Sequence, residues 1–237
     1  MSPIVLFIGF LVVAGVAAYL GHLAQEKRRE EMRVVARQLG CTFDAGGGRG
    51  SRDFEHFELF TRGHSQQAYN TLSGRVTVGD DTYAVRGGDF LYKVTSGSGK
   101  NRRTHTHRFS YWIVYLAWPH CPPLAIRPEN VFDKIAGALG FDDIDFESEE
   151  FSRRFHVKSS DKKFAYDLIE PRMMEFLLPR LTTKLELEHG KLLLSNGSST
   201  WTSAEFTRQL AFANEFLKRW PDHLVARLDA SSGASHA

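Results

Sequence analysis

An apolar run opens the chain. Residues 3–20 contain no charged side chain, and at a rise of about 1.5 Å per residue they give a helix of about 27 Å, close to the hydrocarbon thickness of a bilayer. A cleaved signal peptide is the alternative, because Val16-Ala17-Ala18 resembles a small-residue cleavage site. No Lys or Arg precedes the run, however, and a signal peptide has a positive N-terminal region. We therefore expect residues 1–21 to be a transmembrane anchor.

A charged stretch follows the apolar run. No Pro or Gly interrupts residues 22–39, so we expect the helix to continue as a juxtamembrane segment over residues 22–40 and to end at Gly40. The glutamates Glu26, Glu30 and Glu31 count little toward topology, whereas basic residues beside a span resist translocation. The basic residues predict a single-pass protein of the cell membrane, with the N-terminus outside and the remainder in the cytoplasm. They are Lys27, Arg28, Arg29, Arg33 and Arg37.

Strand patterns dominate the first part of the remaining chain. Residues 71–78 and 82–86 are β-branched runs around Gly79-Asp80-Asp81, which predicts a hairpin. We expect a bulge or bend at Gly87-Gly88. The longest strand pattern, residues 104–118, is apolar on both faces near its end, which is typical of a central strand.

Helix patterns dominate the second part. A helix is expected from Pro128 through residues 131–139, a strand within residues 145–159, two short helices after Asp161 and Pro171, and a hairpin over residues 184–195. Thr202 and Glu205 form a capping-box pattern before another amphipathic helix. The prediction is an α+β fold in which an N-terminal transmembrane helix precedes an antiparallel β-meander and a helix-rich α/β C-terminal half. The soluble domain is expected at residues 41–228 and a disordered tail at residues 229–237.

Composition excludes two classes of protein. The 237 residues carry 30 Lys and Arg against 28 Asp and Glu, a balance that argues against a nucleic-acid partner. The two cysteines are too few for a disulfide-stabilised scaffold.

Several segments carry a resemblance. CPPLAIRPE at residues 121–129, FESEEFSRRFHV at residues 146–157, and the segments Phe164-Ala165 and 170–175 are similar to an uncharacterised family of bacterial single-pass membrane-anchored proteins. The match covers most of residues 39–178, although residues 88–92 match the family's tyrosine-rich strand only imperfectly. The resemblance implies a location and an architecture. It names no catalytic residue and no cofactor.

Candidate chemistry is sparse. Ser98-Gly99-Lys100 lacks the earlier glycine and the final Ser or Thr of a phosphate-binding loop, so a hairpin loop is favoured. His105 and His107 share one strand face and could both contact a metal, but no third ligand is near in sequence. His120-Cys121 is too short a signal to assign haem. We expect no catalytic, cofactor or metal residue from these patterns.

Carboxylates crowd one later segment, where apolar residues alternate with them. A solvated acidic rim explains this pattern better than a metal or catalytic site, and such a surface is a candidate for binding a basic protein partner or the Arg102-Arg103 loop. The acidic residues are Asp142, Asp143, Asp145, Glu147, Glu149 and Glu150.

Three functions remain. The preferred one is a membrane-tethered, non-catalytic interaction or scaffold domain whose helix contacts the lipid bilayer. The alternative is a membrane-anchored hydrolase or metal-dependent enzyme that assembles histidines and carboxylates through its fold. It would be favoured if two of five histidines lay within metal-ligand distance of the acidic segment; these are His56, His64, His105, His107 and His156. A weaker third is a lipid-sensing module that uses residues 27–29 and the Arg102-Arg103 loop.

Overall fold

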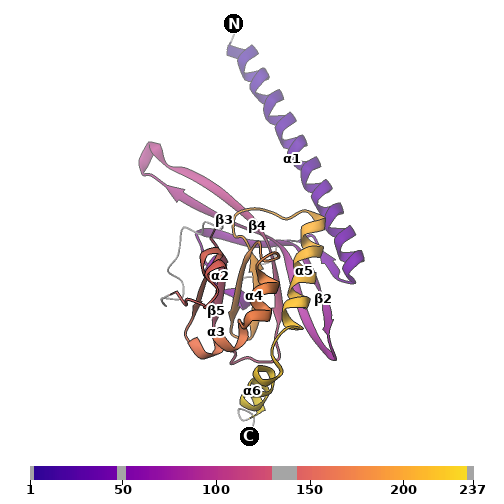
Figure 1. Ribbon diagram of the computed structural model, residues 1–237. Coiled ribbons are helices and arrows are strands. Elements are labelled where there is room, and N and C mark those ends of the chain that lie inside the picture. Colours follow the sequence, from indigo (N-terminus) through magenta and orange to yellow (C-terminus); the bar gives the residue numbers. More distant parts are fainter. Residues whose placement is uncertain (1–2, 47–51, 130–142, 234–237) are drawn as a thin grey trace.

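The computed structural model describes residues 3–46, 52–129 and 143–233 and confirms an α+β fold with a long N-terminal helix (Figure 1). The helices are α1 (Pro3–Leu39), α2 (Glu149–Arg154), α3 (Lys162–Leu168), α4 (Pro171–Leu177), α5 (Ser203–Leu217) and α6 (Asp222–Gly233). The strands are β1 (Thr42–Asp44), β2 (His64–Val78), β3 (Asp81–Ser96), β4 (Arg103–Tyr115), β5 (Leu124–Pro128), β6 (Phe155–Ser159), β7 (Lys184–Glu188) and β8 (Lys191–Ser195). Short 3-10 turns are η1 (Arg52–Phe54), η2 (Glu58–Phe60) and η3 (Gly99–Asn101).

Helix α1 is continuous from its apolar half into the body of the protein. Its first half is long and apolar enough to cross a membrane by length and composition, and its large apolar side chains are exposed as far as Leu23. Gly40 follows the helix with a φ of +64°, the left-handed conformation common at a helix end, as the sequence predicts.

The last turns of α1 belong to the core. Met32, Val35 and Ala36 recur at helical spacing and are at most 3% exposed. They pack in the same cluster as buried residues of the sheet and of α5. Residues 22–40, expected as the juxtamembrane continuation of the same helix, thus pack partly into the core of the body.

The eight strands in the described part of the chain form one antiparallel sheet in the order β1-β2-β3-β4-β8-β7-β5-β6. The predicted hairpin joins β2 to β3, and β4 completes the meander. Strand β4 lies between β3 and β8. Trp112 and Val114 on one of its faces and Tyr111 and Ile113 on the other are at most 1% exposed, which confirms the predicted central strand.

Each face of the sheet has its own cover. Helices α1 and α5 contact each other and the same face (Figure 1). On the opposite face lie Phe54, Phe57 and Phe60. The Phe57 N–H donates to the Phe54 carbonyl at 2.9 Å and the Phe60 N–H donates to the Phe57 carbonyl at 3.0 Å, and all three rings lie in one buried cluster. The ring centroid of Phe60 lies 4.9 Å from Phe90 and 5.1 Å from Tyr111.

The C-terminal half differs from the prediction in two places. Residues 149–154 of the expected strand form α2, because Ser148 caps a helix whose Phe151 is buried; only residues 155–159 form a strand. Strand β5 was not expected so soon after the prolines that precede it, yet it pairs with β6 and β7. The helix expected over residues 131–139 lies outside the described residues.

The C-terminus also differs. Residues 229–233, expected to be disordered, continue α6. The indole N–H of Trp118 donates a 2.7 Å hydrogen bond to the Asp229 carboxylate, and Leu228 is buried, so tertiary contacts hold this turn.

Candidate functional site

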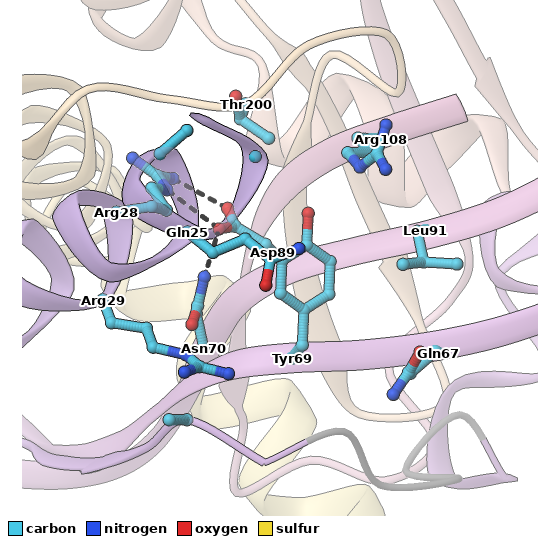
Figure 2. Close-up of a pocket in the computed structure, with 13 residues that line it drawn as sticks. Gln25, Arg28, Arg29, Gln67, Tyr69, Asn70, Asp89, Leu91, Arg108 and Thr200 are labelled. Atoms are coloured by element: carbon cyan, nitrogen blue, oxygen red, sulfur yellow. Dashed lines mark hydrogen bonds and ion pairs between the residues drawn. The ribbon is translucent and has the colours of Figure 1, made fainter. Parts of the chain in front are cut away.

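A pocket of about 670 Å³ lies where α1 meets the sheet (Figure 2). Helix α1, strands β2, β3 and β4 and the loop before α5 all contribute to it. We call it the junction pocket; its principal residues are Arg28, Arg29, Tyr69, Asp89, Leu91 and Arg108.

A buried ion pair forms one wall of the junction pocket. The Arg28 guanidinium donates to both carboxylate oxygens of Asp89, with Nε–Oδ2 and Nη2–Oδ1 distances of 2.9 and 2.8 Å (Figure 2). Asp89 is 0% exposed and also accepts from the Ser110 hydroxyl at 2.6 Å and the Asn70 amide at 3.1 Å. Arg28 donates further to the Trp201 carbonyl at 2.7 Å. This network satisfies a carboxylate that would otherwise be costly to bury.

The Asp89 carboxylate raises the pKa of Arg28. Burial alone lowers the pKa of its guanidinium, but the hydrogen bonds to Asp89 and the charge of that carboxylate outweigh burial and raise the pKa. The pair therefore fixes the side of α1 just after its apolar half against β3.

A β-bulge shapes this part of the sheet. The register of β2 against β3 shifts by one residue between Tyr69 and Leu72. Asn70 within the shift has a φ of +49° and Gly88 on β3 has a φ of +152°. A Cβ on Gly88 would lie 2.9 Å from the Asn70 carbonyl oxygen, so glycine permits the close approach. The extra residue thus lies on β2, opposite Gly88, where the sequence predicts a bulge or bend.

The open side of the pocket is polar and cationic. The charge of Arg108 acts on Tyr69, and Figure 2 shows the Tyr69 hydroxyl directed toward the Arg108 side of the pocket. Burial raises the pKa of Tyr69 to about 12, and the charge of Asp89 adds to this, while Arg108 and Arg28 oppose it. Three arginines and one carboxylate line the pocket. Since Asp89 compensates Arg28, and Arg29 pairs with Glu26, Arg108 is the cation best placed to meet an anionic ligand.

The pocket lies next to the apolar half of α1. Its lining includes Gly21, which directly follows the uncharged run, and extends along the helix to Arg28 and Arg29. Eight residues of helix separate Leu20 from Arg28, a distance of about 12 Å. If the apolar half lies in a bilayer, the end of the pocket at Gly21 is at the level of the headgroups. The headgroups occupy about 5–8 Å on each side of the hydrocarbon core.

The basic residues expected to flank a membrane have different environments. Arg28 points into the protein, Arg29 pairs with Glu26, and both Arg33 and Arg37 pair with Glu30. Lys27 is exposed. Their cationic surface is therefore smaller than the sequence alone suggests.

The acidic segment is remote from the junction pocket along the sheet. Asp143, Asp145 and Glu147 alternate with the buried residues Ile144 and Phe146, as the predicted amphipathic edge requires. Glu149 and Glu150 are exposed in the first turn of α2, and Asp142 lies outside the described residues. A protein partner at this surface stays a prediction.

The histidines do not gather at the acidic segment. His156 lies beside it, with its Nδ1 3.0 Å from Asp143 and its Nε2 against Glu129. The ring centroids of His56 and His189 lie 5.0 Å apart. The His64 ring hydrogen-bonds to the Thr95 hydroxyl. Among the residues that the structure describes, one of the five named histidines, not two, therefore meets the condition for the enzyme hypothesis.

The other candidate groups also lie apart. His105 and His107 are exposed on β4, and the His107 ring stacks on Tyr92 with a centroid distance of 4.9 Å. Cys121 is buried, which raises the pKa of its thiol to about 12. Residues 98–100 turn between two strands, as expected for a hairpin loop. Within residues 3–46, 52–129 and 143–233 no group of three or more His, Cys, Asp or Glu side chains is arranged to hold a metal.

Sequence reasoning missed the partner of Arg28. Arg28, Met32, Val35 and Ala36 share helical spacing, which marks Arg28 as lying on the buried face of α1. Asp89 also stands out in the sequence, because it is the last acidic residue before a run without Asp or Glu that extends to Pro128. Both signals are in the sequence, but nothing local connects two positions 61 residues apart.

No protein-family model matches this chain, and no curated protein matches it. Among solved structures the chain is similar to the mycobacterial trehalose monomycolate transport factor A, with a TM-score of 0.55 and 10% sequence identity. The similarity covers 81% of this chain and 96% of that chain. At this identity the similarity concerns the fold: this chain folds like a mycobacterial transport factor.

Proposed function

We propose that this protein is a membrane-tethered, non-catalytic interaction domain whose junction pocket binds the polar headgroup of a membrane lipid. The observation that carries the proposal is the construction of the pocket. Its wall is the same unbroken helix that contains the apolar span, so the pocket is held beside the headgroups without a flexible linker.

The chemistry of the pocket suits such a headgroup. Arg108 offers charged donors for a phosphate, while Tyr69, Gln25 and Gln67 offer neutral groups for hydroxyls. Leu91 adds an apolar contact. The fold similarity to a trehalose monomycolate transport factor supports a role in handling an amphiphile with a sugar headgroup. Phosphate and sugar hydroxyls are therefore the shared chemistry that we propose for the ligand.

The proposed location is a bacterial cell membrane, with the N-terminus outside and the body in the cytoplasm. The basic residues after the apolar span support this orientation. The resemblance to a family of bacterial membrane-anchored proteins agrees with it.

Lipid retention tests the proposed pocket. The full chain is reconstituted in discs that contain phosphatidylcholine alone, or with phosphatidylglycerol, or with a digalactosyl lipid. Native mass spectrometry then measures the lipid that remains bound after detergent extraction. Tyr69→Phe with Arg108→Gln should lower retention about 10- to 100-fold, because a charged hydrogen bond of about 1.5–3 kcal/mol is lost.

A matched control uses Tyr166→Phe with Arg75→Gln. Both residues are exposed and lie outside the pocket, so retention should not change. Preferential retention of phosphatidylglycerol would identify the phosphate as the ligand group, and preferential retention of the digalactosyl lipid would identify the sugar. Equal retention by the pocket variant and the wild-type chain would contradict the proposal.

Thiol labelling tests the orientation. Cys121 is a poor probe because it is buried, so Ser198, which is exposed in the loop after β8, is changed to Cys in a Cys41→Ser chain. A membrane-impermeant maleimide should label Ser198→Cys only after the membrane is opened. Labelling in intact cells would place the body on the outer side.

A further inference from the structure

The outer half of the β3–β4 hairpin is strongly basic. No acidic residue occurs between Phe90 and Pro128, although the whole chain is nearly balanced in charge. We call residues 93–108 the basic hairpin. Its cationic residues are Lys93, Lys100, Arg102, Arg103 and Arg108, and it also contains His105 and His107.

The basic hairpin is open to solvent. Residues 101–108 are all exposed. In the described part of the chain, Lys93, Arg102 and Arg103 form no ion pair. Val94 on the same hairpin is 39% exposed. In the described residues outside α1, Val94 and Tyr166 are the two large apolar side chains that are exposed. Unpaired cations around an exposed apolar side chain are typical of a surface that meets anionic headgroups.

The hairpin also projects in the right direction. In Figure 1 it leaves the body on the side from which the apolar half of α1 projects. Strand β3 extends seven residues from Asp89, where Arg28 docks, to Ser96, which is about 23 Å. Along α1 the end of the apolar run is only about 12 Å from Arg28. The projection of the 23 Å strand on the axis of α1 is at least 12 Å when the angle between them is below about 60°. At any smaller angle the tip of the hairpin therefore reaches the level of Leu20.

We infer that the basic hairpin is a second membrane contact, which binds the anionic headgroups of the bilayer that holds α1. The inference rests on the anchoring by α1 in the proposed function but not on the junction pocket. Each Lys or Arg near an anionic leaflet raises the binding constant for the membrane about fivefold. Lys93, Arg102 and Arg103 together therefore raise it roughly 100-fold. Two contacts, one through α1 and one through the hairpin, would hold the pocket between them against the lipid surface.

A fluorescent reporter at the tip tests this contact in the full chain. Ser98 is changed to Cys in a Cys41→Ser chain and labelled with an environment-sensitive dye; the remaining Cys121 is buried. The chain is placed in discs of phosphatidylcholine with or without phosphatidylglycerol, each with a lipid that carries a quencher near its headgroup. Strong quenching is expected only in the anionic discs, and high salt should weaken it.

Charge removal identifies the cause. Changing Lys93, Arg102 and Arg103 to Gln should lower quenching in anionic discs to its value in neutral discs. The control changes Lys162, Lys163 and Arg172 to Gln; these residues are exposed on α3 and α4 and should leave quenching unchanged.

A second dye position excludes general proximity. Ser160→Cys, which precedes the N-cap of α3, should stay unquenched in every disc. No quenching at Ser98→Cys in anionic discs, or equal quenching in neutral discs that the hairpin variant does not change, would overturn the inference. Lipid retention by the pocket is a separate measurement, so either proposal can fail alone.

Discussion

Deleting residues 1–40 is expected to unfold the body, whereas deleting residues 1–24 leaves it folded and soluble. The longer deletion removes Met32, Val35 and Ala36 from the core and leaves Asp89 without Arg28. Loss of one large buried side chain costs about 2–5 kcal/mol. Several such losses, together with an uncompensated buried carboxylate, exceed the roughly 5–15 kcal/mol that stabilise a typical domain.

Circular dichroism melting and size-exclusion chromatography measure both deletions. The shorter deletion should give a cooperative transition and a monodisperse peak, because it removes the exposed apolar half and keeps the docked turns of α1. A stable, cooperatively folded protein after deletion of residues 1–40 would contradict the docking of α1. Aggregation of the shorter form alone would show that the body needs a bilayer or partner to stay soluble.

Replacing Arg28 by Met is expected to lower the stability of the soluble form by about 3–5 kcal/mol, because the Asp89 carboxylate stays buried without its compensating charge. For a body of this size each kcal/mol lowers the melting temperature by about 2–4 °C, so a fall of roughly 10 °C is expected. Urea unfolding and thermal melting of the form that lacks residues 1–24 measure the effect.

Two further variants separate charge from packing. Lys27→Met changes the exposed neighbour on the same helix and should shift stability by less than about 0.5 kcal/mol. Arg28→Met with Asp89→Asn should recover at least half of the loss, because Ser110 and Asn70 can still hydrogen-bond a neutral amide. A double variant as unstable as Arg28→Met would mean that the guanidinium acts through packing on Phe206 and not through the ion pair.

Elements with strong local signals could be predicted from the sequence. The uncharged run predicts the apolar half of α1, and Gly40 predicts the end of the helix. Gly79-Asp80 predicts the β2–β3 turn, and Thr202 with Glu205 predicts the capping box that starts α5, in which both hydrogen bonds are present. These signals act within about one turn of chain, so they do not depend on the rest of the fold.

Weaker local signals were misjudged where tertiary packing decided the outcome. Residues 149–154 alternate imperfectly enough to suggest a strand, but Ser148 caps them as a helix and Phe151 enters the core. The segment with Phe54, Phe57 and Phe60 follows a glycine-rich stretch and carries no strand or helix period. Only the sheet shows that these rings cover its second face.

The candidate site depended almost wholly on the tertiary structure. The sequence by itself determined that an apolar helix continues into a charged one, that Arg28 is among its basic residues, and that an acid-free strand pair follows Asp89. The bulge at Asn70, the register of β2 against β3 and the docking angle of α1 together decided that Arg28 meets Asp89 and that Tyr69 and Arg108 face the remaining space. The physical reason is range: periodicity and caps act between near neighbours in sequence, whereas a pair of charges 61 residues apart is selected only when the whole fold brings them out of water together.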